Sequence, residues 1–262
     1  WLTNLKVRYS YGEVGSDKGA PRFNYIQLFE SGGNVTFGKN QNISYGPLYT
    51  EGSLAYHDAT WETAVKQNLG IEMTLFRKLT ASIDLFKEDR TGILMSRNSS
   101  APWMGTGLPS VNIGKTKNHG LELELGWNDK VGKDFSYFAK FNFSTSENRV
   151  VFKDDPNRLD DYLKAAGKPI GYVNKYLVSG NFGSIDDIFN YTQSGITNGS
   201  QNKLIPGDLI YLDYNGDGVI NEKDMAPVAN LNYPLTTYGL TLGINYKGFG
   251  INALFYAATG VY

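Results

Sequence analysis

The sequence predicts an all-β chain that forms part of a large antiparallel transmembrane β-barrel with long extracellular loops. Three observations favour this fold class. Apolar and polar residues alternate along the predicted strands, as they do where a strand has two different faces. These strands are about ten residues long, the length that crosses a bilayer at a tilt. The connections between them are in turn very short and very long.

Composition excludes several other classes of protein. The 262 residues contain no cysteine, which excludes a disulfide framework and a thiolate metal site. Basic residues number 25 and acidic residues 26, so the chain lacks the basic surplus typical of a nucleic-acid-binding protein. Its 18 Tyr and 14 Phe argue against disorder, and no apolar stretch reaches the ~20 residues of a membrane-spanning helix.

Seven strands are predicted in chain order from the alternation. The clearest covers 121–127, where Leu121, Leu123 and Leu125 alternate with Glu122, Glu124 and Gly126. The alternating residues of the seven predicted strands lie within 5–11, 69–75, 79–85, 121–127, 135–143, 238–246 and 249–255. In each of them one face is apolar and the other is mostly polar, which is the pattern of a barrel wall between lipid and an aqueous interior.

This alternation assigns individual side chains to the two faces of the wall. We expect the lipid-facing side to include Leu121, Leu123, Leu125, Phe141 and Phe143. We expect the lumen to be lined by polar residues of the opposite parity, namely Glu72, Asp84, Glu122, Glu124, Lys140 and Asn142.

The connections sort by length and side. The turns at Arg77-Lys78 and Lys247-Gly248 are tight, and 129–133 is nearly so, whereas 13–66, 96–117 and 149–236 are long and polar. Counting strands from Arg77-Lys78 puts every long segment on one side, as in outer-membrane barrels with short periplasmic turns and long extracellular loops. A soluble β-sandwich also alternates, but its strands are shorter. Because seven strands do not close a large barrel, we expect the chain to be an internal piece of a longer protein.

The sharpest local motif runs from Asp213 to Asp224 and has the spacing of a calcium-binding loop. Side-chain oxygens stand at its first, third and fifth positions, glycine at its sixth, a carbonyl at its seventh and a carboxylate at its twelfth. The predicted metal ligands are Asp213, Asn215, Asp217, Val219 (through its carbonyl) and Asp224. We therefore expect a structural Ca²⁺ here, and the alternative is an Asp/Asn/Gly-rich turn without metal.

Catalytic constellations are absent from the sequence. It contains two histidines and no cysteine, and neither an H-E-x-x-H nor a G-x-S-x-G motif occurs. The acidic pairs of the last long segment, such as Asp186 and Asp187, are more simply explained as solvated surface charge. The sequence therefore predicts that the chain is not an enzyme.

A series of short motifs resembles a known family, the SusC/RagA-like TonB-dependent transporters of the outer membrane of Bacteroidetes-type bacteria. The resemblance covers most of the chain and depends on the order and spacing of the motifs. Among them are Leu5-Lys6-Val7-Arg8-Tyr9-Ser10-Tyr11-Gly12, Asn118-His119-Gly120-Leu121-Glu122-Leu123, Gly167-Lys168-Pro169-Ile170-Gly171, and Pro206-Gly207-Asp208-Leu209 leading into the Asp213 loop.

The resemblance implies a 22-stranded barrel with an N-terminal plug, located in the bacterial outer membrane and opened by energy transduced through TonB. It also implies a SusD-like surface lipoprotein that delivers a glycan or peptide substrate. Residues 1–262 would then be a fragment of one barrel domain that contacts outer-membrane lipid. Residues 149–235 would be a long extracellular loop containing the calcium-loop-like motif at 213–224.

Two alternatives stay open at this point. A passive porin-like barrel would share the strands and loops but would need neither plug, TonB nor lid. A secreted soluble β-protein with a dockerin-like calcium loop would share the loop and would stay soluble without detergent. Neither alternative involves nucleic acid.

Overall fold

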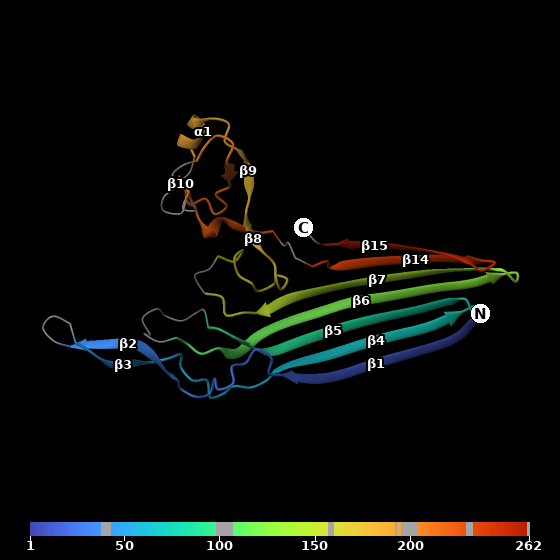
Figure 1. Cartoon of the computed structure of the whole chain (residues 1–262), viewed down its shortest axis with the longest axis horizontal. Coiled ribbons are helices and arrows are strands. Elements are labelled where there is room, and N and C mark those ends of the chain that lie inside the picture. Colours follow the sequence, from blue (N-terminus) through green and yellow to red (C-terminus); the bar gives the residue numbers. More distant parts are fainter. Residues whose placement is uncertain are drawn as a thin grey trace.

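In the computed structural model, which describes residues 1–37, 43–97, 107–156, 160–191, 193–194, 204–228 and 233–260, seven strands form one antiparallel sheet. Their order in the sheet is β1-β4-β5-β6-β7-β14-β15, and Figure 1 shows them side by side. Their bounds are β1 Leu2–Ser16, β4 Glu62–Leu75, β5 Leu79–Met95, β6 Val111–Val131, β7 Phe135–Phe152, β14 Thr236–Tyr246 and β15 Phe249–Thr259. The seven predicted strands and the three short turns between them are confirmed.

The strands are longer than the sequence pattern predicts. β6 has 21 residues and β7 has 18, and the additional residues lie at the end of the sheet where the long connections begin. There Lys117 of β6 lies opposite Asp89 of β5 and Arg149 of β7. The face that is apolar further along β6, at Leu121, is therefore charged at this end. Beyond the bilayer both faces of a strand meet water, and the apolar and polar alternation therefore ends before the strand does. The long connections shrink to 17–61, 96–110 and 153–235.

The register places the apolar residues of all seven strands on one face. One continuous row across the sheet consists of Leu5, Met73, Ala81, Leu125, Phe141, Leu240 and Phe255. The adjacent row, on the opposite face, consists of Lys6, Glu72, Ser82, Glu124, Asn142, Gly239 and Tyr256. If the pairing of two strands slipped by one residue, the apolar side chains of one of them would move to the polar face. The alternation therefore fixes the register.

The described parts of the chain leave the apolar face of the sheet uncovered. Phe249 is 82 % exposed, Ile251 70 % and Val7 62 %. Soluble monomers rarely expose an apolar surface of this extent, so lipid is the solvent that this face fits. Within the described residues β1 and β15 each have one unpaired edge, which requires further strands in a membrane because an open edge is not tolerated in lipid. Among the same residues, no helix has the length and apolar character needed to cross a bilayer.

The long connections carry secondary structure that the sequence pattern did not reveal. β2 (Phe29–Phe37) and β3 (Ile43–Glu51) form a hairpin. Residues 153–235, called the insertion here, contain β8 (Asn174–Tyr176), β9 (Val178–Asn181), α1 (Ile185–Phe189), β10 (Gln193–Ser194), β11 (Leu209–Tyr211), β12 (Val219–Ile220), η2 (Glu222–Asp224) and β13 (Met225–Pro227). Figure 1 shows both segments at the same end of the sheet.

A small core holds the insertion together. Its buried members are Phe182, Ile220, Asp224, Ala226 and Ala165. The insertion also contains three two-stranded pairings, β8 with β13, β9 with β11 and β10 with β12. The insertion is therefore a folded unit and not an extended polar loop.

Candidate functional site

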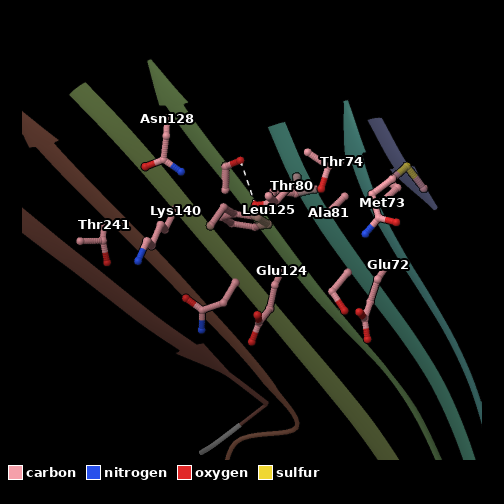
Figure 2. A pocket seen from close by; sticks show the side chains of 15 residues that line it. Glu72, Met73, Thr74, Thr80, Ala81, Glu124, Leu125, Asn128, Lys140 and Thr241 are labelled. Atoms are coloured by element: carbon pink, nitrogen blue, oxygen red, sulfur yellow. Dashed lines mark hydrogen bonds between the residues drawn. The ribbon is translucent and has the colours of Figure 1, made fainter. Parts of the chain in front are cut away.

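The polar face of the sheet carries a hollow of about 660 Å³ that is lined by residues of β1, β4 to β7 and β14 (Figure 2). Four of the six predicted lumen residues line it, namely Glu72, Glu124, Lys140 and Asn142. The other two, Asp84 and Glu122, lie opposite each other in the next row of the same face. The structure therefore gathers all six on one face, opposite the predicted lipid-facing residues.

An ion-pair network on this face spans three strands. Arg8 on β1 pairs with Glu72 on β4 at 2.5 Å and donates to both carboxylate oxygens of Asp84 on β5 at 2.8 Å. The register aligns Arg8, Gly70 and Asp84, so the guanidinium crosses β4 directly above Gly70. A methyl group at Gly70 would lie 2.9 Å from the Asp84 carboxylate and would overlap the Arg8 side chain. Gly70 thus makes room for the network.

Two aromatic rings of the polar face also lie over glycines of a neighbouring strand. Phe86 lies against Gly120, and Phe138 lies against Gly243, in both cases where the register sets them opposite each other. A side chain at either glycine would collide with the ring. The rings therefore lie against the neighbouring strands and do not project into the space in front of the polar face. The sequence analysis missed these pairs because glycine and phenylalanine give no sign of polar-face contact on their own.

A second hollow, of about 720 Å³, joins the sheet to the insertion. On the sheet side Arg90 pairs with Glu62 at 2.5 Å and with Glu88 at 2.8 Å. On the other side Ile170 and Tyr172 of the insertion close it.

Hydrogen bonds from β7 hold this part of the insertion in place. Asn148 accepts from the Ile170 N–H at 2.6 Å, and Arg149 donates to the Gly167 carbonyl at 2.8 Å. The insertion is therefore anchored to the barrel wall through β7, the strand that precedes it in the chain.

The predicted calcium ligands lie in one loop of the insertion, where their oxygens accept backbone hydrogen bonds. Asp213 accepts from the N–H groups of Gly216 and Gly218, each at 2.8 Å. Asp217 accepts from the Val219 N–H at 2.9 Å and from the Asn215 amide at 3.0 Å. These two donors hold the pKa of Asp217 below its usual value, the Val219 N–H with the larger effect.

Asp224 plays a different part from the other predicted ligands. It is fully buried, and it accepts from the N–H groups of Tyr214 at 2.9 Å, Asn215 at 3.3 Å and Asn221 at 2.7 Å. Its carboxylate therefore joins the beginning of the loop to its end. The three N–H donors satisfy both oxygens of this buried carboxylate from within the loop itself.

The donor types of this loop suit a hard cation such as Ca²⁺. However, no group of three or more carboxylate or imidazole side chains able to hold a metal ion occurs in the described part of the chain. The loop is folded by its own hydrogen bonds, and the Ca²⁺ site stays a prediction.

A sheet with one continuous apolar face, one polar face, short turns at one end and folded connections at the other defines the wall of a transmembrane β-barrel. The chain belongs to the family of TonB dependent receptor-like β-barrels, which matches residues 1–255. It therefore lies in the bacterial outer membrane, and the alternative of a secreted soluble β-protein is wrong.

Individual relatives agree with this assignment. A TonB-dependent receptor of Formosa agariphila is 27 % identical over 97 % of this chain and 26 % of its own length. The TonB-dependent receptor SusC of Bacteroides thetaiotaomicron is 23 % identical over 95 % of this chain and 24 % of its own length. The RagAB peptide importer in its open-open state shares the fold, with a TM-score of 0.68 and 18 % identity over 100 % of this chain and 26 % of the solved one.

The resemblance to SusC/RagA-like proteins is thus confirmed, and the chain spans about a quarter of the length of these relatives. The prediction that the chain is not an enzyme agrees with the family, whose members are receptors.

Proposed function

We propose that this chain forms part of the barrel wall of a transporter that imports a nutrient across the outer membrane with energy supplied through TonB. The observation that carries the proposal is the register, which gives seven adjacent strands one lipid-facing side and one polar side within a family of TonB-dependent receptors. The nutrient classes we consider are a glycan or oligosaccharide and a peptide. In this function the wall contributes binding and gating and no chemistry on the substrate.

The polar face would contact the plug that fills the lumen. The Arg8 network keeps its charges paired along the wall, while Glu122 and Glu124 project from β6 without an ion-pair partner among the residues that the structure describes. TonB would act through the N-terminal part of the full-length receptor.

The insertion would be the extracellular loop predicted at 149–235, and we propose that it meets a SusD-like surface lipoprotein. Two facts support this role. The insertion is a folded unit anchored to β7, so it can present a defined surface. The solved structures of the RagAB peptide importer share the fold of this chain.

The test is uptake by cells that carry the full-length receptor, its candidate lipoprotein, or both, in strains with and without TonB. Labelled oligosaccharides and labelled peptides are supplied separately, and we expect uptake of one class only, dependent on TonB and reduced without the lipoprotein. Uptake that persists without TonB would instead support the passive porin-like barrel.

A further inference from the structure

The three short turns at one end of the sheet carry a surplus of positive charge. The turns 76–78, 132–134 and 247–248, taken together with the last residues of β6 from Asp129, contain five basic side chains, Arg77, Lys78, Lys130, Lys133 and Lys247, against the two acidic side chains Asp129 and Asp134. The opposite end differs, because residues 153–233 contain eleven acidic and seven basic side chains. Charge is therefore distributed unequally along the barrel axis.

These turns lie next to one another along the end of the sheet, as Figure 1 shows. The Asn128 N–H donates to the Lys78 carbonyl at 2.9 Å, and the Lys247 N–H donates to the Asp134 carbonyl at 3.2 Å. Lys78 pairs with Asp129 at 2.8 Å. Lys130 lies on β6 and shares the polar face with Glu124, because the two residues have the same parity along the strand. Across the described residues no ion pair holds Arg77, Lys133 and Lys247, which we call the cationic rim.

The backbone of two of these turns is strained in a way that a different sequence would relieve. Within the described residues, the non-glycine residues with positive φ are Phe76 at 55°, Arg77 at 57° and Lys247 at 46°. Two-residue hairpin turns with this conformation favour Asn-Gly or Asp-Gly. A large aromatic residue and two cations occupy positions where small residues would be less strained. Backbone strain of this kind is a reason to look for a function of the side chains.

Exposed aromatic side chains stand beside the cations. Phe249 is 82 % exposed, Phe76 59 % and Tyr246 52 %, and the Lys247 ammonium lies 5.4 Å from the centre of the Tyr246 ring. Tyr246 and Phe249 pair with each other on the lipid-facing side of β14 and β15. Because aromatic residues at the edge of an apolar band lie at the depth of lipid headgroups, Lys247 lies at that depth too.

We propose that the cationic rim binds the phosphate groups of anionic phospholipids in the periplasmic leaflet of the outer membrane. Short turns of outer-membrane barrels face the periplasm, which places the rim at that leaflet. Ammonium and guanidinium groups form short, charge-assisted hydrogen bonds with phosphate, and a cation near an anionic membrane raises binding about fivefold. The inference depends on the membrane location of the chain and not on the transported substrate.

The experiment places the full-length receptor in nanodiscs that contain equal amounts of phosphatidylglycerol and phosphatidylcholine. Native mass spectrometry then measures which lipid stays bound. The rim variant is R77Q/K133Q/K247Q. The control variant, K164Q/K175Q/K223Q, removes the same number of charges from the insertion. Folding of each variant is checked by the shift of the unheated barrel on a denaturing gel, and K133Q/K247Q serves if the threefold rim variant does not fold.

We expect the wild-type receptor and the control variant to retain phosphatidylglycerol at least tenfold over phosphatidylcholine. We expect the rim variant to lose that preference, and 0.5 M salt to weaken it in the wild type because exposed charges are screened. An unchanged preference in the rim variant would overturn the proposal, as would an equal loss in the control. Binding of isolated peptidoglycan that needs the rim, without any lipid preference, would also overturn it. None of these measurements requires transport, so their failure is distinct from failure of the proposed function.

Discussion

Replacing Asp224 by alanine tests whether the predicted calcium loop is held by its own hydrogen bonds. The Asp224 side chain is fully buried and accepts from three backbone N–H groups, those of Tyr214, Asn215 and Asn221. Loss of the carboxylate leaves these donors without an acceptor. Each lost acceptor costs about 1–3 kcal/mol, and we use the lower end because the donors are only partly buried. The expected loss is about 3 kcal/mol in the free energy that keeps the loop closed.

This loss should be local, because the insertion has its own core and the barrel sheet contains none of the affected residues. A loss of about 3 kcal/mol raises the open population about a hundredfold. Proteolysis follows that population when opening is fast compared with cleavage. We therefore expect trypsin to cut the Asp224→Ala receptor in the insertion about a hundred times faster than the wild type, while the barrel still migrates as a folded band. Glu222→Ala, which removes an exposed carboxylate from the same loop, is the control and should change the rate less than threefold.

Chelator separates the hydrogen-bond explanation from the cation explanation. If the three N–H bonds close the loop, the wild type resists trypsin equally with Ca²⁺ and with chelator. Cleavage of Asp224→Ala at the wild-type rate would refute the argument from buried donors. A wild-type rate that rises with chelator as far as the variant's would show that a cation, and not these bonds, keeps the loop closed.

Three further predictions test the remaining parts of the structure. Leu123→Arg places a charge on the lipid-facing side and should lower the free energy of unfolding in vesicles by about 2–4 kcal/mol. Glu124→Arg on the polar face should lower it far less, and equal losses in urea titrations would contradict the register. Gly70→Ala should displace the Arg8 guanidinium above it and lower stability. A double-mutant cycle with Arg8→Ala measures the coupling between the two positions, and purely additive effects would contradict the network. Asp213→Ala combined with Asp217→Ala should abolish any protection of the loop by Ca²⁺ and leave the barrel assembled; Ca²⁺ protection that survives both substitutions would place the cation elsewhere.

The sequence predicts the wall well because a membrane barrel repeats one physical requirement on every strand. Leu121 to Trp127 alternate because lipid meets one face and the lumen the other, and the paired strands repeat that pattern in register. The prediction fails where the requirement ends. Residues 115–119 continue β6 outside the apolar band, where neither face selects apolar residues, so their pattern resembles a polar loop.

Contacts between distant residues could not be predicted from alternation. Arg8 reaches Asp84 only because Gly70 lies between them, and that alignment depends on the register of three strands. The fold of the insertion was missed for a related reason. Its strands are two to four residues long, too short for periodicity to distinguish them from loop.

The wall and the insertion are stabilised by different means, which predicts different responses to the same stress. In the wall, ladder hydrogen bonds in lipid have no water to compete with them, so opening a strand costs several unsatisfied groups at once. In the insertion, stability depends on a few buried side chains, chiefly Phe182, Ile220 and Asp224, and on exposed turns. Segments with so small a core open at low free energy. The insertion can therefore change conformation while the barrel stays intact, which the proposed contact with a surface lipoprotein would require.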